Sequence, residues 1–412
     1  MQITEKQLGQ VRNQIRRVKM CGNPFYEEKF RDINPEDIRT QADFERLPFS
    51  SKQELRDAYP LGLAAVPEEQ IVRIHSSSGT TGTPVIIPYT QKDVDDWALM
   101  FARCYEIAGI TRKDRIQITP GYGLWTAGIG FQLGCEKLGA MAIPMGPGNT
   151  EKQLQMMRDL KSTVICATSS YALLLAEQVE SRGIRDKICL RKGVIGSERW
   201  GDKMRARIKN ILGIELYDIY GLTECYGPGI GISCQEQDGI HIFDDFVYVE
   251  ILDPQTGLPV KDGELGEITL TTLVKEGAPL FRFRTHDLAA FVPGACPCGS
   301  PYPRITPILG RSDDMVKVKG NIIFPGTIED VIKSVPGTSS EYRAVIEHAG
   351  GKDEMTLTVE VEGGTDRTEA ALTIALNFKS KYNLTPKVQI VGEGELPRSE
   401  KKTKRIDDRR FS

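Results

Sequence analysis

The stretch Ser76-Ser-Ser-Gly-Thr-Thr-Gly-Thr-Pro84 decides how this chain is interpreted. Its two glycines let successive backbone N–H groups turn toward one point, and its hydroxyls add further hydrogen-bond donors. This combination predicts a phosphate-binding loop, and it is not a Walker loop because no lysine follows Gly82. The alternative is a flexible Ser/Thr/Gly linker. The flanking runs Ile71–Ile74 and Val85–Tyr89 have strand character, which favours a tight connection on a sheet.

Length and composition bound the class of protein. With 412 residues, one large and one smaller domain are expected. Hydrophobic residues at 40% and charged residues at 26% are ordinary globular values, and a net charge of -3 gives no field directed at nucleic acid or at an anionic membrane. The sequence shows no apolar signal segment and no membrane-spanning run, so we expect a cytoplasmic protein whose partners are small molecules.

The order of the predicted elements indicates an α/β fold. From residue 71 to about 310, β-rich runs alternate with helical stretches, a pattern typical of a largely parallel sheet. A helical lead-in precedes them, and within it Ser51 and Glu54 form a capping box. The predicted strands are 116–119, 140–144, 163–167, 192–195 and 215–219, and the predicted helices are 91–108, 151–160, 171–181 and 202–212.

Two changes of pattern divide the rest of the chain. Residues 240–292 read as closely spaced strands, which predicts a β-rich subdomain. After residue 311 the pattern resets into short strands and two helices, typical of a small α+β domain. We therefore predict a large N-terminal α/β domain over 1–311 and a C-terminal domain over 312–412.

The segment Asp218-Ile-Tyr-Gly-Leu-Thr-Glu224 is the second cluster of functional interest. It places an aromatic ring, a hydroxyl and a carboxylate where a predicted strand ends, and ligands of α/β sheets bind at such ends. Tyr220 suits stacking on a purine, Thr223 suits a phosphate, and Glu224 suits the Mg²⁺ that accompanies ATP. Without the loop at 76–84 the same segment would be an ordinary capped helix start.

The nine cysteines indicate free thiols and one metal site, because their number is odd and no secretory signal is seen. Cys234, His241, Cys296 and Cys298 offer three thiolates and one imidazole, the ligands of a closed structural zinc site. The Cys-Pro-Cys spacing is one residue short of the commoner Cys-x2-Cys, and unrelated buried cysteines are the alternative. The other cysteines are expected to be small core residues, namely Cys21, Cys104, Cys135, Cys166, Cys189 and Cys225.

Taken together, the loop, the Tyr-Gly-x-Thr-Glu cluster and Arg311-Ser-Asp-Asp-Met315 resemble the adenylate-forming acyl-CoA synthetase and luciferase superfamily. Within it, the chain is similar to the phenylacetate-CoA ligase family over its whole length. The motifs that carry this closer resemblance are Asn23-Pro-Phe-Tyr26, Leu47-Pro-Phe49, Gly121-Tyr-Gly-Leu124, Gly196-Ser-Glu198, Gly227-Pro-Gly229 and Pro397-Arg-Ser-Glu400.

The resemblance implies an AMP-forming acid-thiol ligase of phenylacetate catabolism. A carboxylate of phenylacetate or a related aryl acid would attack ATP, with Mg²⁺, to give an acyl-adenylate and pyrophosphate, and the thiol of coenzyme A would then displace AMP. The first alternative is a nucleotidyltransferase that leaves AMP on a small-molecule acceptor. The second, a nucleotide sensor without catalysis, is disfavoured because a binder needs no cation at the reacting phosphate.

The resemblance also implies roles for individual residues. Lys402 would supply the cation at the reacting phosphate, with Lys401 as the rival because the family usually has glycine there. The rest of Lys401–Arg410 is expected to be a solvated basic tail. His286 is expected to be a neighbour without a catalytic role, and Val85 stands where many members have lysine. The implied nucleotide and coenzyme contacts are Ser77, Ser78, Gly79, Thr80, Thr81, Gly82, Gly196, Ser197, Glu198, Asp218, Tyr220, Gly221, Asp287, Arg311 and Gly320, with Thr223 and Glu224 catalytic beside Lys402.

The acid pocket and the hinge complete the expected site. Tyr122, Trp125 and Pro228 suit a flat aryl group, with a core position as the alternative for the tryptophan. Asp313 matches the superfamily's hinge, about which the mobile C-terminal domain would turn between the two half-reactions. A simple surface turn is the alternative there. A homodimer is the assembly considered, and the sequence does not decide it.

Overall fold

The computed structural model describes residues 2–77, 83–124, 126–198, 200–313, 316–318, 321–323, 325–349, 352–397 and 405–410. Backbone contacts divide the chain into two compact units. Unit 1 comprises Met1–Ala167, Cys189–Ser197 and Tyr217–Ile308, and unit 2 comprises Thr168–Ile188, Glu198–Leu216 and Leu309–Ser412. These contact-based units are not the predicted domains, 1–311 and 312–412, which stay a prediction.

Unit 1 begins with short helices that cover a small core of their own. They are α1 (Glu5–Met20), α2 (Pro24–Lys29), α3 (Gln41–Glu45) and α4 (Lys52–Asp57). Apolar residues of α1 such as Val11 and Ile15 are fully buried and belong to one cluster with Phe281. The predicted capping box at α4 is confirmed, because Ser51 and Glu54 each accept a hydrogen bond from the other's backbone N–H.

The main sheet of unit 1 has nine strands in the order β13-β14-β9-β8-β7-β6-β5-β3-β4. Strand β3 pairs in parallel with β4 and β5, whereas β7 with β8, β8 with β9, β9 with β14 and β14 with β13 are antiparallel. The expected largely parallel sheet is confirmed for β3, β4 and β5, and the antiparallel pairing from β7 to β13 departs from it. The reason is the short connection from β7 to β8, which forms a hairpin, since a parallel pair needs a crossover of a dozen residues or more. The strands are β3 (Arg115–Ile118), β4 (Met141–Pro144), β5 (Val164–Thr168), β6 (Lys192–Gly196), β7 (Glu215–Leu222), β8 (Gly227–Ser233), β9 (Ile240–Ile242), β13 (Phe291–Val292) and β14 (Arg304–Ile305).

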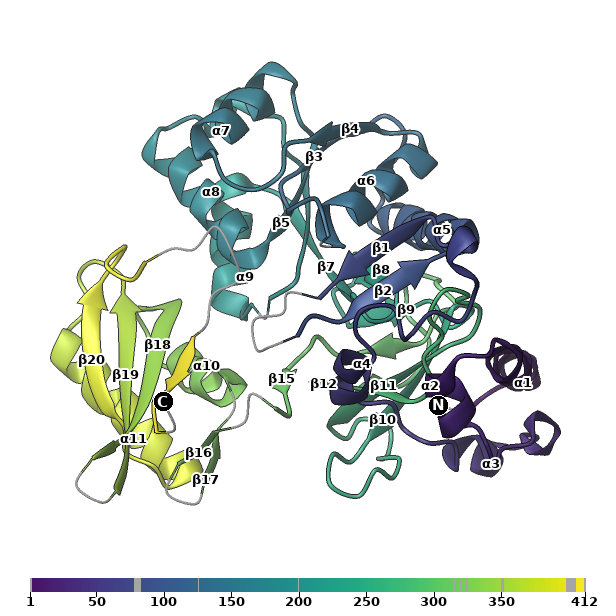
Figure 1. Cartoon of the computed structure of the whole chain (residues 1–412). Coiled ribbons are helices and arrows are strands. Elements are labelled where there is room, and N and C mark those ends of the chain that lie inside the picture. Colours follow the sequence, from purple (N-terminus) through teal and green to yellow (C-terminus); the bar gives the residue numbers. More distant parts are fainter. Residues whose placement is uncertain are drawn as a thin grey trace. The chain divides into compact units, whose positions relative to one another are not determined.

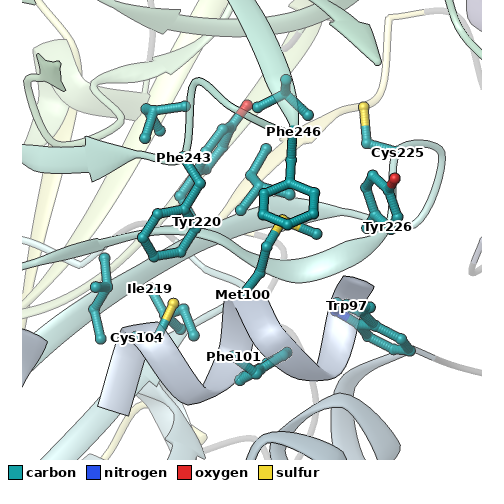
Figure 2. Close-up of a cluster of buried hydrophobic side chains, with 14 of the residues drawn as sticks. Trp97, Met100, Phe101, Cys104, Ile219, Tyr220, Cys225, Tyr226, Phe243 and Phe246 are labelled. Carbon is teal, nitrogen blue, oxygen red and sulfur yellow. The ribbon is translucent and has the colours of Figure 1, made fainter. Parts of the chain in front are cut away.

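Helix α6 (Ala127–Leu138) was not predicted, because three glycines lower its helix propensity. Two of these glycines, Gly130 and Gly134, instead allow α6 to pack closely against α5 (Gln91–Ile107). A Cβ at Gly130 would lie 2.4 Å from Trp97, and one at Gly134 would lie 2.3 Å from Phe101. Figure 2 shows Trp97, Phe101 and other side chains of α5 within the main core. The absence of a side chain at Gly130 and Gly134 therefore lets the two helices meet.

The predicted β-rich subdomain is confirmed in the antiparallel strands β10 (Val247–Leu252), β11 (Gly266–Thr272) and β12 (Phe283–Ala289). A further antiparallel pair, β1 (Arg73–Ser76) and β2 (Ile86–Tyr89), flanks the loop at 76–84. Within the described residues, no helix combines the length and the apolar character that crossing a membrane requires.

Unit 2 contains the helices α8 (Ser169–Ser181) and α9 (Asp202–Leu212) together with an α+β body. Helix α7 itself (Thr150–Asp159) belongs to unit 1. The α+β body has a sheet in the order β20-β19-β18-β21 together with helices α10 and α11 (Figure 1). It buries a core of its own. Strand β15 (Gly310–Arg311) precedes this body in the chain. The elements of the body are β16 (Val316–Val318), β17 (Asn321–Ile323), α10 (Pro325–Lys333), β18 (Thr338–Ala349), β19 (Lys352–Val361), α11 (Arg367–Tyr382), β20 (Lys387–Gly392) and β21 (Ile406–Asp408).

The expected solvated basic tail is wrong for residues 405–410. Strand β21 pairs in parallel with β18, and Arg410 forms ion pairs of 2.6 Å with Asp353 and 2.7 Å with Asp408. Arg405 pairs with Glu341 at 2.9 Å. The basic residues therefore face carboxylates of the same sheet, a pairing that a count of charges along the sequence does not reveal.

Candidate active site and metal centre

The predicted phosphate loop starts and ends between paired strands. The backbone N–H of Ser77 donates to the carbonyl of Val85 at 3.0 Å, and the N–H of Val85 donates to Oγ of Ser77 at 3.1 Å. The strands predicted on both sides are confirmed, which favours a connection on a sheet over a linker. Five of the predicted contacts lie outside the described residues: Ser78, Gly79, Thr80, Thr81 and Gly82.

The end of β7 brings two predicted nucleotide contacts together. The hydroxyl of Tyr220 donates to Oδ2 of Asp287 at 2.9 Å, and Tyr220 is largely buried. The register between β7 and β8 shifts after Tyr220, so that Gly221 lies opposite Pro228. A Cβ at Gly221 would lie 2.1 Å from the carbonyl oxygen of Gly227, and glycine is therefore required by this close approach.

The turn that follows β7 is held from two sides. The hydroxyl of Tyr89 donates to the carbonyls of Thr223 and Tyr226, at 3.4 and 2.9 Å. The side-chain oxygen of Thr223 lies 3.1 Å from that of Thr126. The turn Thr223–Tyr226 thus presents Thr223 and Glu224 on a backbone that neighbouring side chains fix.

Lys52 is a functional candidate that the sequence analysis missed. Its Nζ lies 3.0 Å from Oε1 of Glu224, whose side chain is 5% exposed, while that of Lys52 is 34% exposed. Lys52 is the first residue of α4, directly after the capping box at Ser51. The local sequence explains the helix and contains no signal that would connect it with a carboxylate so far along the chain.

The surroundings of Asp287 are strongly charged. Glu267 accepts hydrogen bonds from Arg284 at 2.7 and 3.0 Å, and its carboxylate lies 3.6 Å from Nδ1 of His286. Burial by itself would raise the pKa of Glu267, but the hydrogen bonds from His286 and Arg284 outweigh it and bring the pKa to about 2. His286 has a φ of 66°, which is uncommon outside glycine. The prediction that His286 is a neighbour without a catalytic role is not tested by this contact.

The residues predicted to lie against adenine are at the end of β6, directly after it, and on β7. Gly196 ends β6, where a Cβ would lie 2.6 Å from the carbonyl oxygen of Ile219, and Ser197 follows with a φ of 70°. The backbone N–H of Asp218 donates to Oγ of Ser233 at 2.8 Å. In unit 2, Glu198 accepts hydrogen bonds at the start of α8, from the hydroxyl of Ser169 at 3.0 Å and the backbone N–H of Ser170 at 2.9 Å.

Two of the three predicted acid-pocket residues are described. The hydroxyl of Tyr122 is buried and has no hydrogen-bond partner among the described residues. Burial also raises the pKa of Tyr122, so the phenol stays protonated at neutral pH. The carbonyl of Pro228 accepts a hydrogen bond from the indole of Trp97 at 2.8 Å. Trp125 lies outside the described residues.

Fewer of the predicted residues of the C-terminal part are described. Lys402, its rival Lys401 and Gly320 lie outside the described residues. Arg311 donates to both carboxylate oxygens of Asp313, each at 2.8 Å, which is the bidentate geometry of a strong pair. The predicted hinge residue is therefore tied to the residue predicted beside the ribose.

The four predicted metal ligands converge on one point. The ligand atoms of Cys234, His241, Cys296 and Cys298 all lie within 4.8 Å of one another. The sulfurs of Cys234 and Cys296 are 3.6 Å apart, and Nε2 of His241 is 3.4 Å from the sulfur of Cys298. Ligand bonds of about 2.1–2.3 Å to a tetrahedral zinc require separations of this size. Nδ1 of His241 lies 3.0 Å from the carbonyl of Tyr302, the arrangement that leaves Nε2 for a metal.

The remaining cysteines follow the sequence prediction with two exceptions. All nine cysteines are free thiols, and Cys104, Cys135, Cys166 and Cys225 are buried as expected. Cys189 is exposed and Cys21 is partly exposed. The prediction of a core position is therefore wrong for Cys189, which stands in the connection before β6 and not in an element.

Comparison with known families, sequences and structures finds that this chain is similar to AMP-binding enzymes and CoA ligases. Residues 24–272 match the family described as AMP-binding enzyme, and residues 320–410 match the AMP-binding enzyme C-terminal domain. The phenylacetate-coenzyme A ligase of Escherichia coli (strain K12) is 41% identical over 398 residues, which cover 94% of this chain and 90% of that protein. The phenylacetate-coenzyme A ligase of Pseudomonas putida is 39% identical over 399 residues, with the same coverage. The crystal structure of a 2-hydroxyisobutyryl-CoA ligase in complex with R3-HIB-AMP matches 98% of this chain and 90% of its own, with a TM-score of 0.88 and 26% identity.

Proposed function

Because this chain belongs to the family of AMP-binding enzymes, we propose that it is an AMP-forming ligase that joins phenylacetate or a related aryl acid to coenzyme A. The observation that carries the proposal is the identity of about 40% to phenylacetate-coenzyme A ligases of several species over 94% of the chain. The setting in which we place the enzyme is phenylacetate catabolism in the cytoplasm.

In the first half-reaction, a carboxylate oxygen of the acid attacks the α-phosphorus of ATP. The bond from that phosphorus to the bridging oxygen breaks, and pyrophosphate leaves with the electron pair. Asp287 is assigned to the ribose, where a carboxylate suits a diol. Thr223 is assigned to a phosphate, and Lys402 supplies a positive charge near the reacting phosphate. The 3.0 Å pair of Lys52 with Glu224 supports a further cation at this end of the site.

The carboxylate of Glu224 fits a magnesium ion that arrives with ATP. Oxygen ligands of this kind suit Mg²⁺, which binds through one or two carboxylates together with substrate phosphates. The ion would neutralise phosphate charge when it is bound. Glu224 is nearly buried and sits on a fixed turn, so it can hold one defined position toward the nucleotide.

In the second half-reaction, the thiolate of coenzyme A attacks the acyl carbon, and the bond to the AMP oxygen breaks. An acyl-adenylate hydrolyses when water reaches it, so the thiol must enter as pyrophosphate leaves. We assign this exchange to a rotation of residues 312–412 about Asp313, which withdraws Lys402 and brings the turn at Gly320 to the pantetheine channel. The bidentate pair of Arg311 and Asp313 supports a defined conformation at the hinge.

We further propose that Cys234, His241, Cys296 and Cys298 hold one structural zinc ion. The four ligands leave no position for a substrate water, so the ion has no part in the reaction. It would connect the end of β8, the middle of β9 and the loop before β14, none of which is long. A homodimer stays a prediction.

The decisive experiment follows products of the purified enzyme with ATP, phenylacetate and coenzyme A. The proposal expects AMP and a thioester in equal amounts, and exchange of labelled pyrophosphate into ATP only when the acid is present. A nucleotidyltransferase would instead form AMP adducts of an acceptor without coenzyme A. The similarity to CoA ligases does not favour that alternative. If no aryl acid supports exchange, the proposed function is wrong.

A further inference from the structure

A lysine lies in the core of unit 1 with no use in the steps above. Lys275 follows β11, and its side chain has no exposed surface. Its Nζ has no hydrogen-bond partner among the residues that the structure describes. Burying an ammonium group destabilises the folded state unless its charge is compensated. If the side chain at position 275 only filled space, methionine or leucine would fill it without burying a charge.

Two tyrosine rings take the place of hydrogen-bond acceptors. Nζ of Lys275 lies 3.6 Å from the centre of the Tyr89 ring and 4.4 Å from that of the Tyr226 ring. The negative faces of aromatic rings attract a cation, most strongly where water is excluded. The ammonium therefore draws the two rings toward one point between them.

Both tyrosines control the turn that carries Thr223 and Glu224. Tyr226 is the last residue of that turn, and the hydroxyl of Tyr89 donates to the carbonyls of Tyr226 and Thr223. Figure 2 shows Tyr226 beside Cys225 in this turn, close to the core side chains of α5. Anything that fixes the two rings thus also fixes the backbone on which Glu224 stands.

Acidic groups on another element support the charged form of Lys275. Asp93 is fully buried on α5 and accepts hydrogen bonds of 2.7 Å from the backbone N–H groups of Glu276 and Gly277, the two residues after Lys275. Burial lowers the pKa of Lys275 and outweighs the acids, bringing it to about 8. The titratable groups that interact with Lys275 are Tyr89, Tyr226, Asp93, Asp96, Cys225 and His75.

We propose that Lys275 is a positioning residue for the adenylation step: its ammonium, between Tyr89 and Tyr226, holds the Thr223–Tyr226 turn so that Glu224 meets magnesium-ATP. Lys275 is too deeply buried to touch a substrate, and it acts through the turn alone. The inference rests on the proposed function, because the magnesium role of Glu224 is assigned there. The protein therefore retains a buried charge that costs stability because this charge positions Glu224.

The test replaces Lys275 by methionine, which keeps the length of the side chain and removes its charge. Affinity for magnesium-ATP is measured by titration calorimetry without acid, and pyrophosphate exchange with phenylacetate is measured from pH 6.5 to 9.5. We expect Lys275→Met to weaken magnesium-ATP binding about tenfold, the equivalent of one cation–π contact, and to leave the KM for the acid unchanged. Wild-type exchange should fall as the pH rises past about 8, where Lys275 loses its proton, and the variant should lack this fall.

Two further variants make the outcome decisive. Tyr89→Phe keeps the ring and the ammonium but removes the hydroxyl bonds to the turn, so binding should weaken while the fall above pH 8 persists. Lys192→Met is the control, because Nζ of Lys192 also lies over a tyrosine ring, 5.2 Å from the centre of Tyr217, and donates to the carbonyl of Ala108. It should bind magnesium-ATP as the wild type does.

Unchanged magnesium-ATP affinity and an unchanged pH profile in Lys275→Met would overturn the inference. If that variant does not fold, unchanged affinity in Tyr89→Phe would overturn it instead, since the proposed link runs through that hydroxyl. The two proposals fail separately. A wild type that binds magnesium-ATP but activates no aryl acid refutes the proposed substrate, and the calorimetric comparison still decides the role of Lys275.

Discussion

The hydroxyl of Tyr220 donates a hydrogen bond of 2.9 Å to Oδ2 of Asp287, across 67 residues of sequence. Tyr220 ends the straight part of β7, and Asp287 lies on β12 of the second sheet. The bond therefore couples the residue assigned to the purine with the residue assigned to the ribose. The contact joins the two sheets at the candidate nucleotide site.

Replacing Tyr220 by phenylalanine should loosen this coupling. A hydrogen bond to a charged group contributes about 1.5–3 kcal/mol, so we expect the KM for ATP to rise about tenfold or more, with little change in the KM for the acid. Steady-state kinetics with each substrate varied in turn measures both. Tyr217→Phe, on the same strand but bonded to Lys192, is the matched control and should leave both values as they are.

Replacing Lys402 by alanine should separate the two half-reactions. Because the ammonium is needed only where charge develops at the α-phosphate, adenylate formation should fall by about a hundredfold or more. Thioester formation from supplied phenylacetyl-adenylate should be retained. Lys401→Ala tests the rival assignment, and it should retain adenylate formation if Lys402 supplies the charge. Equal loss of both half-reactions in Lys402→Ala would contradict the scheme of a rotating domain.

The metal site predicts one zinc ion per chain. Elemental analysis of the purified protein should find a ratio close to one, and His241→Ala should lower the metal content and the thermal stability together, since a structural zinc contributes to folding. Cys189→Ser removes a thiol that lies outside the cluster and should change neither. Metal-free protein with full stability would exclude the assignment.

The lowered pKa of Glu267 predicts that the stability of the fold decreases at acid pH. Its pKa is about 2 in the folded chain, against an ordinary value of 4.5, so its carboxylate stabilises the fold above pH 4.5 and loses this effect as the pH falls toward 2. Glu267→Gln should therefore lower the free energy of unfolding at pH 7 by about 2–3 kcal/mol, with the difference shrinking below pH 4.5. Urea unfolding across this range measures it, with the exposed Glu69→Gln as the control. A constant difference at all pH values would mean that packing, and not charge, is responsible.

The lowered pKa of Lys275 predicts the opposite change of stability with pH. Its pKa of about 8 lies below the ordinary 10.5, so the folded state disfavours the proton, and stability should rise as the pH increases from 8 to 10.5. At pH 7, Lys275→Met should be more stable than the wild type by about 2–3 kcal/mol, and this gain should shrink above pH 8. Thermal unfolding at pH 7 and pH 10 tests the point. A loss of stability at pH 7 would show that the ammonium stabilises the fold.

The sequence predicted those parts of the fold whose cause is local. The capping box at Ser51, the strands around the loop at 76–84 and helix α9 follow from neighbouring residues, and all are found in the structure. Helix α6 escaped prediction because its glycines matter only against α5. Strand β21 escaped it because Glu341 and Asp353, which pair with Arg405 and Arg410, come from other strands.

The same division applies to the candidate site. The residue types of Cys234, His241, Cys296 and Cys298 were enough to predict that they form one group, and their ligand atoms lie within 4.8 Å of one another, as a metal site requires. The pair of Lys52 with Glu224 and the position of Lys275 between two rings could not be predicted. Both depend on contacts between distant segments, and a lysine in an unremarkable sequence context gives no sign of them.

The glycines of α6 have a consequence for engineering the choice of acid. Gly130 leaves the space that Trp97 fills, and the indole of Trp97 holds the carbonyl of Pro228, a predicted wall of the acid pocket. A methyl group at position 130 would push the ring of Trp97, and through the indole hydrogen bond it would shift the carbonyl of Pro228. Libraries aimed at new aryl acids can therefore be built from positions that never meet the substrate, where the chemistry of the site itself is left alone.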